Sequence, residues 1–354
     1  MSDKNSIKFV VFADFHYREG VFPTSVAELE GIFDKAHACG ADFVLSAGDM
    51  YNDCIRSPEF VDAFKNNKYG MPAFDVYGNH ELEMPGNRME DVTPNLTNMD
   101  VVWGTEDGKM DYNIGYYHYD INGFRLVCID SNYSYNTELE IFEHNRPGSF
   151  GPPRENTLEA ALHPDELVWL RRVILDAADK GLHCIVTAHH CFNGAWQGLS
   201  PDWKKIQAIY KEANEKRVGT VLMSINGHIH TDRQQVLDNV LYFDVNTTRI
   251  GCLNIVPQVH YKDPKHTVMF TEHDEEGNVI SVRERPLYEL LMSPHTWYFT
   301  DALSAIVTVS DDGHITIEGM ETTWLNGVVP TKKDGLCDAA NTGISSGEYW
   351  LDIQ

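Results

Sequence analysis

The chain lacks a hydrophobic run long enough to span a membrane, and it carries little positive charge. Its first apolar run, residues 7–13, is only as long as a β-strand. Its 354 residues include 28 Lys and Arg against 53 Asp and Glu, which gives a formal net charge of −25. A surface of this sign repels nucleic acid and anionic membranes at long range. These properties argue against a membrane protein and against polymeric nucleic acid as the partner.

Cysteine is sparse and shows no pairing pattern. The seven cysteines are odd in number and contain no Cys-x-x-Cys, which excludes a zinc ribbon and a thioredoxin-type motif. Residues 1–6 are polar and contain no apolar signal core. We therefore expect a reducing, cytoplasmic location. Nothing in the sequence indicates an oligomeric state.

Strand-like and helix-like patterns alternate in the first part of the chain. Residues 7–13, 43–46 and 73–77 have the apolar character of buried strands. Ser25 and Glu28 form a capping-box signal for a helix that begins at Ser25. A second helix is expected to begin at Pro58. Such alternation predicts an α/β fold whose parallel sheet binds its ligands at the carboxyl ends of the strands.

The second part divides at about residue 260. Before it, Asn122-Gly123 predicts a hairpin, a long helix begins at Pro164, and strands are expected near 184–188 and 220–225. After it, short alternating strands separated by turns predominate. We predict a catalytic domain over residues 1–258 and a β-rich C-terminal extension over residues 259–354. Two segments with little periodicity, 82–112 and 132–161, are expected to be long loops that act as lids or recognition elements, or merely decorate the surface.

Five short polar motifs follow hydrophobic runs, and they carry the functional signal. One motif alone is weak, but five that each follow a predicted strand are specific. Their carboxylate, amide and imidazole groups form the ligand set of two adjacent borderline metal ions. The motifs are Asp14-Phe15-His16, Gly48-Asp49, Gly78-Asn79-His80-Glu81, His189-His190 and Gly227-His228-Ile229-His230.

This ligand set suits the hydrolysis of phosphate esters. The reaction needs a hydroxide, neutralisation of charge and a proton for the leaving oxygen, and two cations supply the first two. A carboxylate can bridge both ions. Asp49 follows a glycine at the end of its strand and is the best candidate for the bridge.

The motif set resembles the calcineurin-like metallophosphoesterase superfamily over about residues 7–250. The resemblance implies a four-layer α/β/β/α sandwich, here with a small, mostly-β C-terminal part. It also implies two divalent transition-metal ions, manganese, iron or zinc. His80 would protonate the leaving group or stabilise the transition state. The implied ligands are Asp14, His16, Asp49 and His230 for one ion, and Asp49, Asn79, His189 and His228 for the other.

Two positions depart from the family pattern. Many members have an acid three residues after the bridging aspartate, where this chain has Asn52 followed by Asp53, and either could hold His80. Purple acid phosphatases have a tyrosine at that offset, and Tyr51 is one residue early, which disfavours that subclass. Family members often read His-x-Pro in the fourth motif, which favours His189 over His190 as the ligand, although a cysteine replaces the proline here.

The sequence thus predicts a metal-dependent phosphoesterase that hydrolyses a small phosphodiester or phosphomonoester through a metal-bridging hydroxide. A nuclease is a second interpretation, against which the net charge argues. A non-catalytic scaffold is a third, although no ligand position is lost. Arg146 and Arg154 could clamp the phosphate or be solvated loop residues. Glu81 could support the metal ligands or stabilise the start of a helix.

Overall fold

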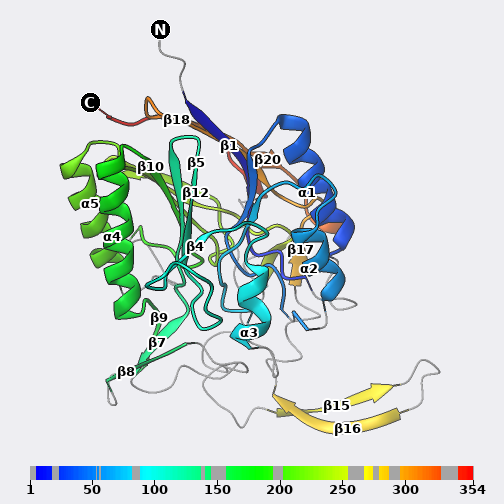
Figure 1. Cartoon of the computed structure of the whole chain (residues 1–354). Helices are drawn as coiled ribbons and strands as arrows, with labels where there is room; N and C mark the ends of the chain where they lie inside the picture. Colours follow the sequence, from blue (N-terminus) through cyan, green and yellow to red (C-terminus); the bar gives the residue numbers. More distant parts are fainter. Residues whose placement is uncertain are drawn as a thin grey trace.

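The computed structural model describes most of the chain, with gaps. The described residues are 5–17, 24–52, 54–55, 57–81, 88–136, 140–144, 157–193, 202–253, 267–273, 279–286, 296–327 and 342–353. Two large mixed sheets lie face to face, with helices on their outer sides (Figure 1). This arrangement confirms the predicted four-layer α/β/β/α architecture.

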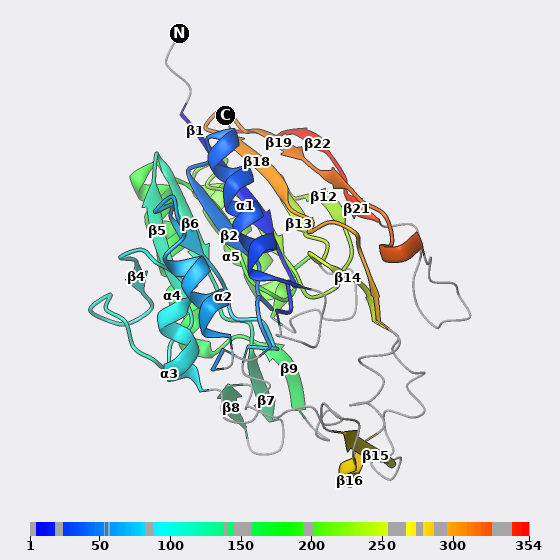
Figure 2. The same cartoon turned by 90° about the vertical axis from the view of Figure 1, so that its right-hand side faces the viewer.

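The first sheet combines strands from the two ends of the chain. Its order is β22-β19-β18-β1-β2-β3, with β1 parallel to β2 and β2 parallel to β3. β18 runs antiparallel to β1 (Figure 2). Residues on both sides of position 258 therefore share one sheet. The strands are β1 (Ser6–Phe12), β2 (Phe43–Ser46), β3 (Ala73–Phe74), β18 (Ala305–Ser310), β19 (His314–Glu318) and β22 (Gly347–Trp350).

The second sheet has the order β12-β13-β11-β10-β6-β5-β4. Its central strands β6, β10, β11 and β13 are parallel. The predicted Asn122-Gly123 turn joins β5 to β6, and both turn residues have positive φ, as a tight hairpin requires. The strands are β4 (Val102–Trp103), β5 (Tyr117–Ile121), β6 (Phe124–Cys128), β10 (His183–Thr187), β11 (Val221–Asn226), β12 (Arg233–Leu237) and β13 (Val240–Asp244).

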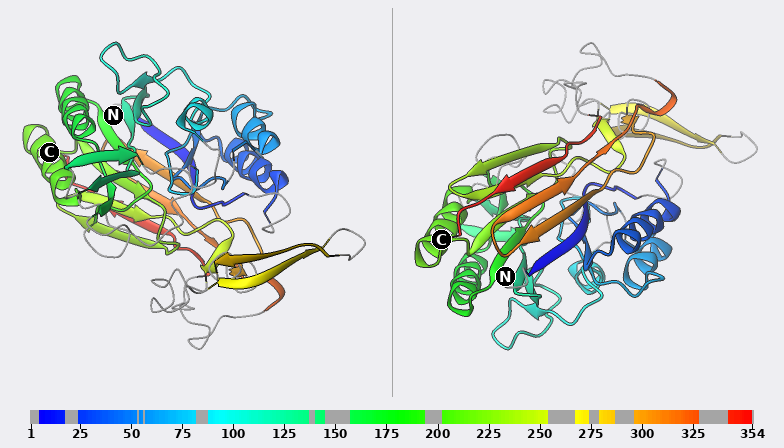
Figure 3. Two further views of the ribbon diagram at one scale, coloured as in Figure 1. Left: turned by 90° about the horizontal axis from the view of Figure 1, so that it is seen from below. Right: turned by 90° about the horizontal axis from the view of Figure 1, so that it is seen from above.

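Two helix pairs form the outer layers, α1 and α2 beside the first sheet and α4 and α5 beside the second (Figure 3). The Ser25–Glu28 capping box begins α1, and Gly40, with φ of 68°, ends it. No helix among the described residues is long and apolar enough to cross a membrane. The helices are α1 (Val26–Cys39), α2 (Pro58–Lys65), α3 (Met89–Val92), α4 (Pro164–Lys180) and α5 (Trp203–Lys216), with 3₁₀ turns η1 (Thr93–Asn95) and η2 (Leu325–Gly327).

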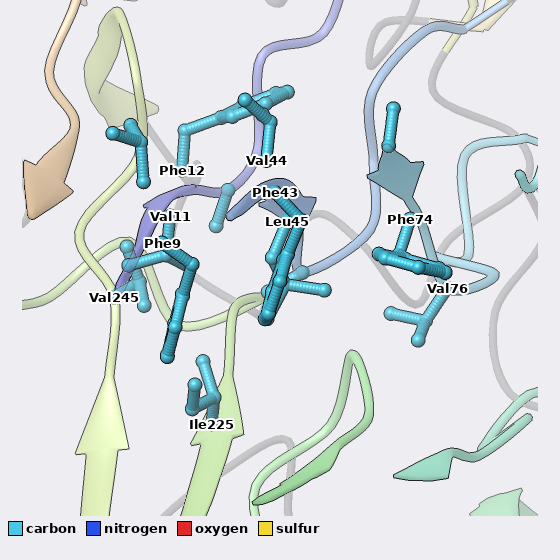
Figure 4. Close-up of a cluster of buried hydrophobic side chains, with 14 of the residues drawn as sticks. Phe9, Val11, Phe12, Phe43, Val44, Leu45, Phe74, Val76, Ile225 and Val245 are labelled. Atoms are coloured by element: carbon cyan, nitrogen blue, oxygen red, sulfur yellow. The ribbon is translucent and has the colours of Figure 1, made fainter. Parts of the chain in front are cut away.

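The core between the sheets fixes their relative position. Phe9 and Phe12 of β1 and Leu45 of β2 are fully buried, as are Ile225 of β11 and Val245, which directly follows β13 (Figure 4). Burying one such side chain stabilises the fold by about 1.5–3 kcal/mol. Loops at the carboxyl ends of strands from both sheets are consequently held against one another.

Smaller sheets complete the fold. The segment predicted as a long loop over residues 132–161 contains a three-stranded sheet, so that prediction was wrong for its described part. The strands were missed because their short sequences mix polar and apolar residues and lack the continuous apolar character that predicted residues 43–46. They are β7 (Tyr133–Asn136), β8 (Ile141–His144) and β9 (Thr157–Ala161). The remaining pairs are β14 (Ile250–Leu253) with β17 (Thr296–Tyr298), β15 (Thr267–His273) with β16 (Val279–Pro286), and β20 (Met320–Glu321) with β21 (Gly343–Ile344).

Candidate metal centre

The five sequence motifs meet where the two sheets adjoin. They follow β1, β2, β3, β10 and β11. The first three of these strands are parallel in the first sheet, and the last two are parallel in the second. Backbone hydrogen bonds join neighbouring motifs: Asp14 N–H donates to the carbonyl of Gly48 at 3.0 Å, and Gly227 N–H donates to that of His189 at 3.0 Å. The predicted convergence of the motifs is therefore a property of the fold.

One group of donor atoms surrounds Asp14. Its Oδ1 lies 3.2 Å from Nε2 of His230 and 3.9 Å from Nε2 of His16. The two imidazole nitrogens are themselves 3.2 Å apart. All three residues present one donor atom to the same small space, as the ligands of one ion do.

A second group surrounds Asn79 and Asp49. The Asn79 Oδ1 lies 3.2 Å from Nε2 of His189 and 3.0 Å from Nδ1 of His228. Nε2 of His189 is 3.1 Å from Oδ2 of Asp49. That same oxygen is 3.8 Å from Nε2 of His16 in the first group. Asp49 thus lies between the two groups, where a bridging ligand belongs.

Hydrogen bonds hold two of the histidine rings in an orientation that suits the binding of cations. Nδ1–H of His189 donates to the carbonyl of Ala47 at 2.8 Å, and Nδ1–H of His230 donates to that of Ile250 at 3.0 Å. Each ring therefore turns its Nε2 lone pair toward the centre. Metal-binding histidines typically have their second nitrogen held in this way.

The electrostatics also suit cations. Asp14 and Asp49 are buried, and buried carboxylates need a compensating charge. Burial, and then His80, lowers the pKa of His16 to about 3, while burial and His189 lower that of His228 to about 3. Both rings are therefore neutral at pH 7. Burial opposes protonation of His189 too, but Asp49 outweighs it and raises its pKa to about 9, so a proton competes there with a cation.

His190 has a different environment from His189. Its Nδ1 lies 2.8 Å from the hydroxyl of Ser131, and burial lowers its pKa well below the usual value. No described contact joins it to Asp49. The geometry supports His189 as the better candidate ligand.

Backbone conformation marks the centre in a way the sequence analysis missed. Nine described non-glycine residues have positive φ, and five of them are predicted ligands. This conformation costs of order 1–3 kcal/mol per residue and collects at functional sites. Asp and His tolerate it better than most residues, which is the available sequence signal. The five are Asp14, His16, Asp49, His228 and His230, with φ between 50° and 68°.

His80 lies beside the centre and is held by Asp49 and Asn52. Its backbone N–H donates to Oδ1 of Asp49 at 2.8 Å, and its Nδ1 lies 3.0 Å from Nδ2 of Asn52. Asn52, one of the two predicted partners of His80, therefore contacts its ring. Asp53, Arg146 and Arg154, the other candidates for contact with His80 or substrate, lie outside the described residues.

Glu81 connects two motifs through its buried carboxylate. It accepts backbone N–H bonds from Met50 at 2.5 Å and from Gly78 at 2.8 Å, with longer ones from Asp49 and Tyr51. A Cβ at Gly78 would lie 2.0 Å from Oδ1 of Asp49, so only glycine permits this approach. Glu81 therefore supports the ligand loops, the first of its two predicted roles.

Replacing Glu81 by glutamine is expected to weaken metal binding about 10- to 100-fold, as the loss of supporting groups does. The new amide would turn an N–H toward backbone N–H donors. Glu166→Gln is the matched control, because Glu166 is equally buried and accepts the N–H of Asp130 at 2.7 Å, outside the ligand groups. Calorimetric metal titration of both variants tests this, and equal metal affinities would contradict it.

Tyr51 is expected not to bind iron as a phenolate. Its ring is fully buried, and burial raises its pKa well above the ordinary value, which disfavours the charged form. The iron-loaded protein should therefore lack a tyrosinate charge-transfer band in its visible absorption spectrum. A band that disappears in Tyr51→Phe would contradict the ligand assignment.

Comparison with known proteins agrees with the fold. Residues 7–232 match the model of the calcineurin-like phosphoesterase family, and the chain belongs to this family. The family is dimetal-dependent, and the chain has Asp and His clusters able to bind metal. Family membership supports metal-dependent hydrolysis of phosphoesters. No curated protein matches the chain.

Three solved structures illustrate the likeness. A dimetal phosphatase from Danio rerio is 14% identical with a TM-score of 0.53, covering 90% of this chain and 98% of that one. A putative 5'-nucleotidase from Staphylococcus aureus is 14% identical with a TM-score of 0.41, covering 80% of this chain and 54% of that one. The GAP50 anchor in the inner membrane complex of Plasmodium is 12% identical with a TM-score of 0.44, covering 99% of this chain and 90% of that one. At such identities the likeness concerns the fold.

Proposed function

We propose that the protein hydrolyses a small phosphodiester or phosphomonoester with two divalent transition-metal ions, manganese, iron or zinc. The observation that carries this proposal is the position of Asp49 between two groups of donor atoms. Asp14, His16, Asp49 and His230 would hold one ion. Asp49, Asn79, His189 and His228 would hold the other.

When bound, such ions lower the pKa of water toward 7 and neutralise the charge on phosphate oxygens. The protein's own contacts orient the donors: the N–H of Asp14 donates to the carbonyl of Gly48, and carbonyl acceptors orient the rings of His189 and His230. His80 lies beside Asp49, with its Nε2 3.8 Å from Oδ2 of Asp49. From there it can donate a hydrogen bond or a proton to a leaving oxygen.

The test is turnover of a substrate panel by manganese-loaded protein. The panel contains p-nitrophenyl phosphate, bis-p-nitrophenyl phosphate, cyclic nucleotides and glycerophosphodiesters, which separates monoesterase from diesterase activity. Elemental analysis should find about two ions per chain, and chelation should abolish an activity that returns with divalent metal. One ion or none at saturation would overturn the dinuclear site.

Two other functions are outcomes of the same test. Two bound ions without turnover on any substrate would indicate a binding scaffold. Cleavage of polymeric nucleic acid in preference to small esters would indicate a nuclease, which the net charge of −25 opposes.

The proposal includes a cytoplasmic location. The described cysteines Cys39, Cys54, Cys128, Cys184 and Cys191 are free thiols, the state that a reducing compartment maintains.

A further inference from the structure

A single side-chain amide connects a predicted metal ligand to the predicted catalytic histidine. Oδ1 of Asn52 lies 3.2 Å from Nδ1 of His16, and its Nδ2 lies 3.0 Å from Nδ1 of His80. Asn52 is only 4% exposed, so water does not readily replace either contact. The two rings pack at right angles with centroids 4.6 Å apart. Both rings therefore present the same type of nitrogen to opposite ends of one amide.

The orientation of this amide follows from the role of His16. Nε2 of His16 points at Asp14 and lies 3.2 Å from Nε2 of His230. A ring that binds a cation through Nε2 carries its proton on Nδ1. That Nδ1–H needs an acceptor, and the Asn52 carbonyl oxygen provides it. The amide then has only its NH₂ group to offer His80.

We propose that Asn52 is a positioning residue that transmits the protonation pattern of His16 to His80 and keeps the His80 proton on Nε2. This inference rests on the proposed function, because it takes His16 as a metal ligand. An N–H of Asn52 requires a lone pair on Nδ1 of His80, so the neutral ring must carry its hydrogen on the other nitrogen. That nitrogen is the one that faces Oδ2 of Asp49 at 3.8 Å.

The consequence concerns what His80 offers the substrate. With hydrogen on Nε2, the ring meets a phosphate or leaving oxygen as a donor. An aspartate in place of Asn52 would accept hydrogen bonds from the Nδ1–H groups of both rings. Nε2 of His80 would then no longer need to carry the hydrogen. The amide thus selects a donor at His80 without adding a negative charge to the centre.

The tautomer is directly measurable by long-range ¹H–¹⁵N correlation spectra of the full chain labelled with ¹⁵N-histidine and loaded with zinc. The His80 signals are identified by their loss in His80→Ala. We expect Nε2 of His80 to be protonated and its Nδ1 to be a hydrogen-bond acceptor. In Asn52→Asp, Nδ1 of His80 should become protonated while zinc stays bound. Asn67→Asp is the matched control, since Asn67 is buried and its side-chain amide donates to the carbonyls of Phe64 and Met71, and it should leave the His80 signals unchanged.

Kinetics supply a second measurement. Asn52→Leu removes both contacts, and kcat is expected to fall about 10- to 100-fold, the usual cost of a supporting residue, with KM little changed. A proton on Nδ1 of His80 in the wild type, or an unchanged tautomer in Asn52→Asp, would overturn the inference even if the enzyme is active. Absence of zinc binding would overturn the proposed function and this inference with it. If zinc binds and the tautomer is as expected but no substrate is turned over, the proposed hydrolysis is refuted and the inference about Asn52 stands.

Discussion

Replacing Asp49 by alanine is expected to remove both metal ions and to lower turnover about 10³-fold or more. Asp49 is the only residue assigned to both donor groups, and its Oδ2 lies 3.1 Å from His189 and 3.8 Å from His16. Metal ions contribute several kcal/mol to transition-state stabilisation, and each 1.36 kcal/mol is a tenfold change in rate. Elemental analysis and calorimetric titration measure the loss of metal.

Two further variants make this result specific. His16→Ala should mainly weaken one ion, because His16 belongs to only one group. Asp244→Asn controls for the loss of a buried carboxylate, since Asp244 bonds to Asn193 at 2.6 Å outside both groups. It should keep both ions. If Asp49→Ala bound two ions with wild-type affinity, the ligand assignment would be wrong.

Replacing His80 by alanine should give the opposite combination, both ions retained and turnover reduced by about 10²–10⁴, the range for a general acid. His80 contacts Asn52 and Asp49 but is assigned to neither ion. The reduction should be larger for alkoxide leaving groups than for p-nitrophenolate, because a poor leaving group depends more on an added proton or hydrogen bond. Steady-state rates on matched esters provide the measurement.

The comparison of leaving groups decides how His80 acts. Equal reductions for both kinds of ester would argue against proton donation and would favour stabilisation of phosphate charge. Loss of metal from His80→Ala would assign it to the ligands instead. Measuring metal content in His80→Ala tests this alternative, because His16, Asp49 and His80 also form a group able to hold an ion.

Much of this architecture could be predicted because local signals agreed with the fold. The Ser25–Glu28 capping box, Gly40 and the Asn122-Gly123 turn mark their elements by side-chain and backbone preferences that act within a few residues. Parallel strands bring their carboxyl ends to one edge, so the motifs within each sheet were expected to meet. That the edges of two separate sheets adjoin was an expectation from the family resemblance.

Other features depend on contacts that no local pattern encodes. The pairing of β1 with β18 joins segments that are distant in sequence. The sequence of either strand does not indicate whether its partner is near or far along the chain. The Asn52 amide lies between His16 and His80 because separate loops meet there, so the offset from Asp49 could suggest this contact but could not establish it. The positive φ of five ligand residues is likewise imposed by the assembled loops.

The pairing of β1 with β18 means that the strand leading to Asp14 and His16 gains its second neighbour only late in synthesis. Ser6 lies opposite Ser310, and β1 leads directly to Asp14 and His16. Until β18 leaves the ribosome, one side of β1 has unpaired backbone groups, and such an edge is prone to pair with other chains. Contacts so distant in sequence also slow folding. Excising residues 1–258 as a catalytic unit would make that unprotected edge permanent, so the C-terminal strands serve the metal centre without contributing any of its assigned ligands.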